Sequence, residues 1–450
     1  YNEISIRGST PLYTNNFTLE AVEELSYSDA LKMIGGAVGA DVCDHVFKTN
    51  ELIQLKNSKK KYDVVVTELF STECMLGWAW HFKAHSVVIT SSENLPWATD
   101  RFGLPDNPSY IPTYFVDYTS KMTLYERLVN TWTLIKGKLL YELYSTKASN
   151  VIAKKFFGPE LPDLNVLAYN TTLHLINTHF SISNSRPLLP NTVEVAGLHV
   201  RSPKPVDKHF NQILETDTKG VIYFSMGSLF LPETFPKQIL QAMFDALSEV
   251  PYKVLWKANH TNFSPELRIP ANVHFETWMP QHDILCDDRV KLFISHGGMM
   301  GTQESVSCGK PILGMPIFAD QTLNIKRAES SGYGKMLNLQ TVTKENFANA
   351  LRELLFDPKY ADNVKKVSAL FKDRILNPLD TSVYWIEYVI RHNGAPHLQS
   401  SAKDLAWYQY YLVDVIAIAL TIPAILTYIA YVISKIFLTK VIKKSKIKTN

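Results

Sequence analysis

The chain has 450 residues, enough for two ordinary domains, and its formal net charge of +3 is too small to indicate a nucleic-acid partner. Apolar residues make up 46% of the chain and charged residues only 20%, which excludes a disordered protein. The four cysteines (Cys43, Cys74, Cys286 and Cys308) lack metal-ligand spacing. We interpret them mainly as buried thiols, with a disulfide as the alternative.

The first part of the chain, residues 1–196, alternates short apolar runs with helical patterns, which predicts an α/β domain. Its predicted strands are Tyr62–Thr67, Ser86–Thr90, Leu173–Asn177 and Val193–Ala196. Residues 1–8 are also typical of an interior strand, and because no apolar leader precedes them we expect the front of this domain to be missing. Residues 99–119, rich in Pro, Gly, Asn and Asp, predict a long surface loop, and residues 123–157 have helical periodicity.

The basic segment 197–205, which contains Gly and Pro, predicts a linker to a second domain, residues 206–395. The predicted strands of this domain are Val221–Ser225, Lys253–Trp256, Val290–Ser295 and Pro311–Ile317. They are continuous apolar runs that alternate with predicted helices, which is the pattern of a parallel sheet covered on both faces. We therefore predict an α/β protein with two doubly wound, Rossmann-like domains that face a cleft.

An apolar segment near the C-terminus, residues 412–434, reaches the ~20 residues that span the ~30 Å hydrocarbon core of a bilayer, so we predict one transmembrane helix. Aromatic residues gather in the juxtamembrane segment 396–411, and lysines gather in the tail 435–450. This asymmetry predicts a lumenal body and a cytosolic tail. Lys446 and Lys448 fit either an endoplasmic-reticulum retrieval signal or a plain stop-transfer cluster, and small residues in the apolar segment are compatible with a homodimer.

The turn after the predicted strand Val290–Ser295 carries the chemistry of the second domain. Gly297, Gly298 and Gly301 remove side chains there, so that backbone N–H groups and a helix N-terminus can face an anion. The polar and aromatic side chains that accompany them are His296, Thr302, Glu304, Trp278, Gln281, Asp320 and Gln321. This set predicts a nucleoside diphosphate site. It offers hydrogen-bond donors to the phosphates, a carboxylate to the ribose hydroxyls and an indole on which the nucleobase can stack.

These residues resemble the donor-binding signature of the UDP-glycosyltransferases, the family that includes the animal UDP-glucuronosyltransferases. The insect members are most similar, on Phe224–Ser228 (FSMGS) and Ser295–Thr302 (SHGGMMGT), and the resemblance extends from Tyr62 to the lysine-rich tail. It implies a GT-B type of fold, a UDP-sugar as co-substrate with no cofactor, and an endoplasmic-reticulum membrane location. One departure is Met300, because vertebrate members usually carry Asn there and Met cannot donate to phosphate.

The same resemblance implies a role for each residue of the donor site. Trp278 would stack on uracil, and Gln281 and Glu304 would hold the ribose. Asp320 and Gln321 would hold the transferred sugar. The residues implied at the diphosphate are Ser228, His296, Gly301 and Thr302, with Gly297 and Gly298 in the same turn.

Sugar transfer needs a base for the acceptor hydroxyl and stabilisation of the departing diphosphate. The sequence has no Asp-x-Asp pair for a metal clamp, so we expect no metal, and the helix N-terminus and side-chain donors would stabilise the leaving group. The family's general base is a histidine whose segment would lie before Tyr1, and no histidine of the first domain matches its motif. The carboxylate partner of this base would be Glu68 or Glu73, in the turn after the first predicted strand.

We therefore predict a membrane-anchored UDP-glycosyltransferase that transfers a hexose to small lipophilic acceptors with inversion. The resemblance to insect members implies glucose. The alternatives are a transferase that uses UDP-glucuronate, a catalytically silent UDP-sugar-binding membrane protein, and a receptor or structural protein. Three sequons, at Asn16, Asn170 and Asn259, are candidate glycan sites of a lumenal body.

Overall fold

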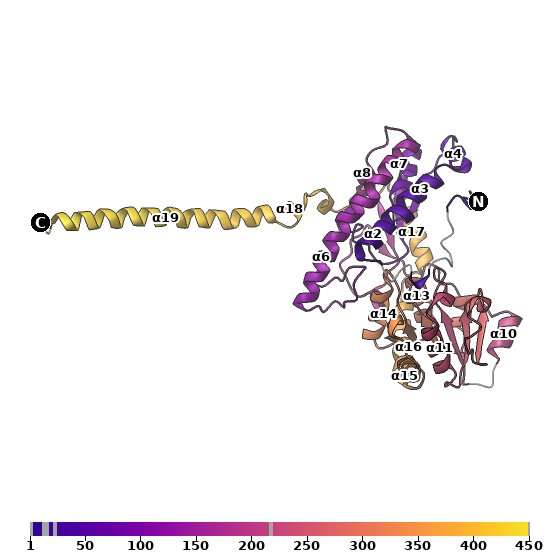
Figure 1. Ribbon diagram of the computed structural model, residues 1–450. Helices are drawn as coiled ribbons and strands as arrows, with labels where there is room; N and C mark the ends of the chain where they lie inside the picture. Colours follow the sequence, from indigo (N-terminus) through magenta and orange to yellow (C-terminus); the bar gives the residue numbers. More distant parts are fainter. Residues whose placement is uncertain (1–2, 11–17, 21–24, 216–218, 449–450) are drawn as a thin grey trace. The chain divides into compact units, whose positions relative to one another are not determined.

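The computed structural model describes residues 3–10, 18–20, 25–215 and 219–448, so the sequon at Asn16 lies outside the described residues. Two compact units are present, residues 1–399 and residues 400–450, and each is considered by itself. The first unit contains two parallel sheets, which lie before and after the predicted linker 197–205 (Figure 1).

The second sheet of this unit has six strands, all parallel. They are β5 Val221–Ser225, β6 Lys253–Lys257, β7 Val273–Glu276, β8 Val290–Ser295, β9 Ile312–Gly314 and β10 Gly334–Met336. Their order in the sheet is β10-β9-β8-β5-β6-β7, the doubly wound Rossmann order. The strand order reverses between β5 and β8, and ligands bind at the carboxyl ends of such a pair.

Helices cover both faces of the six-stranded sheet, as its continuous apolar strands predict. They are α10 Lys208–Leu214, α11 Lys237–Leu247, α12 Gln281–Leu285, α13 Met299–Ser307, α14 Gln321–Ser330, α15 Lys344–Phe356 and α16 Pro358–Lys372. Along β5, Ile222 and Phe224 join the core beneath α11 and α15, while Val221 and Tyr223 join the core on the opposite face. Helix α15 begins after Thr343, whose side chain accepts a hydrogen bond from the Asn346 N–H group and so caps the helix.

The first sheet has four parallel strands in the order β1-β2-β3-β4. These strands are β1 Val64–Glu68, β2 His85–Thr90, β3 Leu173–Ile176 and β4 Thr192–Glu194. The helices of this half are α2 Tyr27–Gly35, α3 Asp41–Val46, α4 Asn50–Lys56, α5 Gly77–Phe82, α6 Leu124–Tyr141, α7 Lys147–Phe157, α8 Leu164–Tyr169, α9 Phe180–Ser183 and, returning from the end of the unit, α17 Pro378–Arg391. A π-helical segment, Glu142–Thr146, joins α6 to α7, so the predicted helical stretch is continuous.

Single 3₁₀ turns and one further π-helical segment complete the first unit. They are Gly36–Ala40 (π), Cys74–Leu76, Asp100–Phe102, Pro232–Thr234, His260–Asn262, Leu339–Thr341 and Pro396–Leu398. Helices α2, α3 and α4 and strands β7 and β10 are elements that the sequence pattern did not predict. Each is short, and β7 and β10 each lie at an edge of the six-stranded sheet.

Two local predictions are wrong. Residues 3–6 are exposed and have no regular structure, so the strand predicted at the start of the chain is not formed among the described residues. Residues 99–119 form an irregular segment as predicted, but much of it is buried rather than on the surface. The side chain of Asn130 explains this burial, because it accepts from the Thr113 N–H group and donates to the Pro108 and Ile111 carbonyl oxygens, all at 2.8 Å.

The cysteines form two disulfides, Cys43–Cys74 and Cys286–Cys308, so our main interpretation of them as free thiols is wrong and the alternative holds. Both pairs join segments that are distant in sequence, separated by 31 and 22 residues. The spacing of cysteines along a chain does not by itself show such proximity.

The second unit contains a 3₁₀ turn at Ser401–Asp404, the short helix α18 Trp407–Tyr410 and the long helix α19 Val413–Lys448 (Figure 1). Within α19, residues Val413–Ile442 form a 30-residue segment that is long and apolar enough to cross a membrane, and its most apolar part has a mean hydropathy of 2.2. The helix starts within one residue of the predicted apolar segment and continues beyond its predicted end at residue 434.

Candidate active site

A cavity of about 890 Å³ opens at the carboxyl ends of β5 and β8, where the strand order reverses. Two similar turns form its floor. The Gly227 N–H group donates to Ser225 Oγ after β5, and the Gly297 N–H group donates to Ser295 Oγ after β8. The predicted site residues that line the cavity are Ser228, Trp278, Gln281, His296, Gly298, Gly301, Glu304, Asp320 and Gln321. The topology thus gathers side chains that span almost a hundred residues of sequence.

The His296 ring fits between two glycines. A Cβ atom on Gly227 would lie 2.7 Å from His296 Cε1, and a Cβ on Gly298 would lie 2.6 Å from His296 Nε2. Side chains at these positions would therefore displace the ring. Nδ1 of His296 is buried and has no hydrogen-bond partner among the described residues. Burial, with a smaller contribution from the charge of Lys257, lowers the pKa of His296 to about 4, so the imidazole is neutral at pH 7.

Helix α13 begins at Met299, and the N–H groups of its first turn point toward the cavity end of the helix. Gly297 has φ of +85°, and a Cβ there would lie 2.4 Å from Ile325 Cγ1, so α14 requires this glycine for packing. Thr302 is buried, and its hydroxyl donates to the Gly298 carbonyl oxygen at 3.1 Å. Neither Gly297 nor Thr302 lines the cavity.

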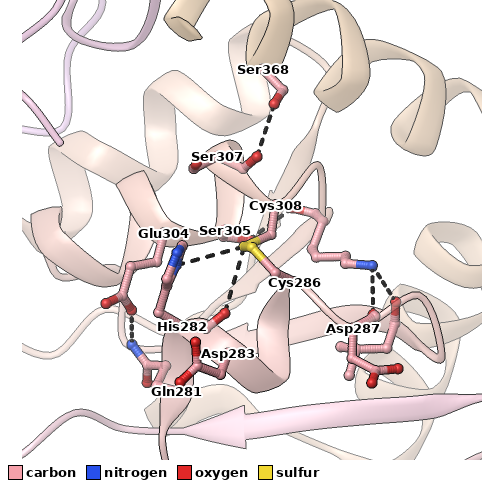
Figure 2. Close-up of a disulfide and its surroundings, with 12 residues drawn as sticks. Gln281, His282, Asp283, Cys286, Asp287, Glu304, Ser305, Ser307, Cys308 and Ser368 are labelled. Carbon is pink, nitrogen blue, oxygen red and sulfur yellow. Dashed lines mark hydrogen bonds between the residues drawn. A yellow bond between two sulfur atoms is a disulfide. The ribbon is translucent and has the colours of Figure 1, made fainter. Parts of the chain in front are cut away.

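One end of the cavity carries an indole, an amide and a carboxylate. The Trp278 ring is 67% exposed, and Lys257 Nζ lies 4.5 Å from its centroid. Gln281 Nε2 donates to Glu304 Oε2 at 2.6 Å, as Figure 2 shows, and Tyr223 donates to Gln281 Oε1 at 3.4 Å. An exposed aromatic face is suited to stack on a nucleobase, and a carboxylate beside it is suited to accept hydrogen bonds from the ribose hydroxyls.

The loop that precedes α14 forms another part of the cavity lining. Asp320 occupies the N-cap position of α14, and its carboxylate accepts a hydrogen bond from Asn324 Nδ2 at 2.9 Å. Gln321 Oε1 accepts from the N–H groups of Ile317 and Phe318 at 2.9 and 3.0 Å. These bonds occupy the amide oxygen of Gln321 and fix its side chain. Burial raises the pKa of Asp320 to about 6, with a further upward contribution from the charge of Glu93.

The four-stranded half supplies an apolar wall to the same cavity. Its contributors include Met33 and Ile34 of α2, Val38, Phe70 after β1, and Tyr114. The sequence analysis did not identify these residues, because they come from separate helices and loops. It also missed Lys257, although its position at the carboxyl end of a predicted strand was a usable signal.

The two candidate carboxylates of the first half lie in different surroundings. Glu68 is exposed at the end of β1 and accepts a hydrogen bond at 2.6 Å from the hydroxyl of Ser91, which lines the cavity. Glu73 is buried in the core, where it pairs with Arg101 and accepts from the Tyr141 hydroxyl at 2.6 Å. Glu73 therefore has core partners, and Glu68 is the carboxylate near the cavity.

Three side chains near the nucleotide end of the site have the chemistry of zinc ligands. His282, Cys286 and Cys308 place one ligand atom each within 4.8 Å of one another. The sulfurs of Cys286 and Cys308 are bonded to each other, however, and a disulfide offers no thiolate to a metal. Nε2 of His282 also contacts the Arg201 carbonyl oxygen at 2.7 Å. In its oxidised form this cluster is a structural disulfide (Figure 2).

Comparison with known proteins defines the class. Residues 10–448 match the family described as "UDP-glucoronosyl and UDP-glucosyl transferase", and the chain belongs to this family. It is 37% identical over 422 residues to UDP-glucosyltransferase 2 of Dactylopius coccus, covering 93% of this chain and 80% of that protein. It is 32% identical over 391 residues to UDP-glucuronosyltransferase 1A7 of Rattus norvegicus, covering 86% and 72%. The protein is therefore a UDP-glycosyltransferase, and its donor is a UDP-sugar.

Solved structures show the same architecture. The glycotransferase of kitacinnamycin superimposes with a TM-score of 0.56 at 14% identity, covering 81% of this chain and 83% of that one. The calicheamicin glycosyltransferase CalG4 gives 0.54 at 14% identity, covering 81% and 84%. These likenesses establish the GT-B type of fold, in which two Rossmann-like halves face each other.

Proposed function

We propose that this protein transfers glucose from UDP-glucose to a hydroxyl group of small lipophilic acceptors, with inversion at the anomeric carbon and without a metal. The observation that carries the proposal is the composition of the single cavity. Its lining combines groups suited to a nucleotide sugar, from the six-stranded half, with apolar groups of the four-stranded half such as Met33, Ile34 and Phe70. A polar donor and a lipophilic acceptor can thus meet in one cavity.

Each end of the cavity suits one part of UDP-glucose. Trp278 stacks on uracil, and Gln281 and Glu304 hold the ribose. His296, Ser228 and the first turn of α13 hold the diphosphate, and the unpartnered Nδ1 of His296 supports this role. Asp320 and Gln321 hold the sugar hydroxyls. A neutral His296 stabilises the departing UDP by hydrogen bonding rather than by charge.

Glu68 is our candidate for the carboxylate that orients the general base. Its bond to Ser91 places it at the edge of the cavity, whereas Glu73 is committed to Arg101 and Tyr141 in the core. The five histidines of this half (His45, His81, His85, His174 and His179) do not line the cavity, so we propose none of them as the base. We propose that the base takes the acceptor proton as the hydroxyl oxygen attacks the anomeric carbon and UDP departs.

The second unit suits a protein of the endoplasmic-reticulum membrane, with α19 as its single span, a lumenal body and a cytosolic tail. The lysines after residue 434 follow the positive-inside rule, and two disulfides in the body fit an oxidising compartment. Exposed Asn170 and half-buried Asn259 then become candidate glycan sites.

The test is an assay of the full chain in microsomes, with UDP-glucose and UDP-glucuronate offered separately against a panel of phenols and other lipophilic alcohols. We expect UDP release coupled to formation of β-glucosides, and at least a tenfold preference for UDP-glucose. Turnover with UDP-glucuronate alone would overturn the donor assignment. Binding of UDP-sugar without any product would favour a silent binding protein.

A matched pair of variants, Glu68→Gln and Glu73→Gln, tests which carboxylate is the partner of the base. Glu68→Gln should lower kcat without changing the affinity for UDP, whereas Glu73→Gln should lower the stability of the fold.

A further inference from the structure

The disulfide Cys286–Cys308 lies directly behind the nucleotide end of the cavity. Cys286 is the C-cap of α12 and Cys308 is the C-cap of α13, and their Cα atoms are 4.6 Å apart. Gln281 is the first residue of α12, and the Glu304 carbonyl oxygen accepts from the Cys308 N–H group at 2.9 Å. The bond therefore joins the ends of the two helices that carry the Gln281–Glu304 pair (Figure 2).

Helix α12 depends on external contacts for its position. It has five residues, too few for a stable helix in isolation. Its Asp283 side chain pairs with Arg201 at 2.5 Å, and His282 contacts the Arg201 carbonyl oxygen, so these contacts lead to the linker segment rather than to α13. The polar and covalent side-chain connections from α12 and its cap to α13 and its cap, in the part of the chain that the structure describes, are the Gln281–Glu304 hydrogen bond and the contacts around the disulfide. Ile284 and Leu285 of α12 also lie in the same buried apolar cluster as Val306 of α13, but such packing is not directional and does not fix the position of the Gln281 amide.

The position of Gln281 is sensitive to any shift of α12. Its amide lies between Glu304 and Tyr223, and a Cβ atom on Gly301 would approach Gln281 Nε2 to 3.4 Å. The amide is thus held close to the backbone of α13. A covalent bond at the far end of α12 limits how far the two helices can separate, which keeps both side chains in place before the ligand arrives.

We propose that the Cys286–Cys308 disulfide is a positioning element of the nucleotide site, which holds α12 against α13 so that its reduction weakens UDP binding. This inference rests on the proposed role of Gln281 and Glu304 at the ribose. Reduction by a dithiol or by glutathione breaks the S–S bond and forms two thiols, while the reductant is oxidised to its own disulfide. The nucleotide site then responds to the redox state of its compartment.

The second disulfide provides a matched control. Cys43–Cys74 joins α3 to the 3₁₀ turn after β1 in the four-stranded half, and neither residue lines the cavity. Each disulfide can be removed by a double substitution. One variant carries Cys286→Ser with Cys308→Ser, and the other carries Cys43→Ser with Cys74→Ser. A general loss of stability would affect UDP binding in both variants, whereas a positioning role affects it in the first alone.

The experiment measures UDP affinity by calorimetry on the full chain in detergent, before and after graded reduction with dithiothreitol, with thiol alkylation and mass spectrometry to quantify the opening of each disulfide. We expect the Kd for UDP to rise about tenfold as Cys286–Cys308 opens and to recover on reoxidation. In kinetics, the KM for the UDP-sugar should rise by a similar factor while kcat at saturating donor stays within twofold.

A further variant separates positioning from structural damage. In Gln281→Ala, which already lacks the amide, reduction should change the Kd for UDP by less than twofold, because the group that the disulfide positions is gone. The inference is overturned if the Kd of the wild-type protein is unchanged while alkylation shows Cys286 and Cys308 to be free, or if opening Cys43–Cys74 has an equal effect. Failure of the oxidised wild-type protein to bind UDP would instead refute the proposed function.

Discussion

At the scale of single residues, the proposed contact with the transferred sugar depends on one buried carboxyl group, that of Asp320. Burial raises the pKa of Asp320 to about 6; the charge of Glu93 raises it further, while the Asn324 bond and the charge of Arg327 lower it. The carboxyl is ionised above this pH and protonated below it. We expect the Kd for UDP-glucose to rise about tenfold between pH 8 and pH 5, because about one molecule in ten keeps an ionised acceptor for the sugar hydroxyls at pH 5.

The measurement is calorimetry with UDP-glucose, whose phosphates do not titrate in this range, on the wild-type protein and on Asp320→Asn. The variant should bind more weakly at pH 8 and show a flat profile, since an amide does not ionise. Because burial holds the pKa of His296 at about 4, this neighbour stays neutral throughout the window. An equally steep pH profile in Asp320→Asn would show that another group controls the affinity.

At the scale of elements, helix α6 has an unusual distribution of apolar side chains. Its outward face carries large apolar residues at helical spacing, namely Leu124, Tyr125, Leu128, Trp132, Ile135 and Leu139. Its inward face includes Asn130, Thr133 and Gly137 beside the buried Leu134. Few apolar contacts therefore hold this helix in the fold. Hydrogen bonds of buried polar side chains, such as those of Asn130, contribute as well.

Two substitutions on α6 test this division because they remove the same atoms from opposite faces. Leu134 is 6% exposed and Leu128 is 63% exposed. Leu134→Ala should lower the free energy of unfolding by about 2–5 kcal/mol, and Leu128→Ala should change it by less than about 0.5 kcal/mol. Helix propensity changes equally in both and cancels. Urea unfolding of the full chain in detergent measures the difference, and similar losses at the two positions would contradict the assignment of faces.

The elements that could be predicted from sequence are those whose pattern is local. Strands β5 and β8 have their predicted bounds because Val221–Ser225 and Val290–Ser295 are continuous apolar runs. The burial of segment 99–119 could not be predicted from its own residues. Asn130, which lies outside the segment, provides hydrogen-bond partners for its backbone groups. The core location of Glu73 likewise depends on Tyr141, which lies 68 residues away.

At the site, the sequence identified the residues that follow predicted strands, because parallel topology brings strand ends together. It could not identify the apolar wall, which depends on how helices such as α2 pack over the four-stranded sheet. Gly297 and Thr302, which it assigned to the ligand, also have structural contacts, since Gly297 packs against Ile325 of α14 and the Thr302 hydroxyl donates to the Gly298 carbonyl oxygen. A glycine-rich turn serves packing as well as binding, and spacing alone does not separate the two uses.

At the scale of the whole first unit, the two halves are joined by a buried ionic contact. Glu93, which follows β2, pairs with Arg186 at 3.0 Å in its own half and with Arg327 of α14 in the other half. Gln303 adds neutral contacts, accepting from the Gly197 N–H group at 2.8 Å and donating to the Asn177 carbonyl oxygen at 3.0 Å. Arg327 lies on α14, and Asp320, at the N-cap position of the same helix, lines the cavity, so the contact between the halves and the cavity share this helix.

Removing the cross-half partner should therefore affect both stability and substrate binding. Arg327→Met leaves Glu93 buried with one remaining cation, and we expect a loss of about 3–5 kcal/mol in the free energy of unfolding. The matched control, Lys335→Met, breaks a partly exposed pair with Glu353 inside one half and should cost less than about 1 kcal/mol. At a temperature where Arg327→Met remains folded, its KM values for both donor and acceptor should rise, since the cavity needs both halves in register. Equal stability and unchanged KM values in the two variants would mean that contacts other than the Glu93–Arg327 pair, such as those of Gln303 and the His179–Phe371 ring contact, hold the halves together.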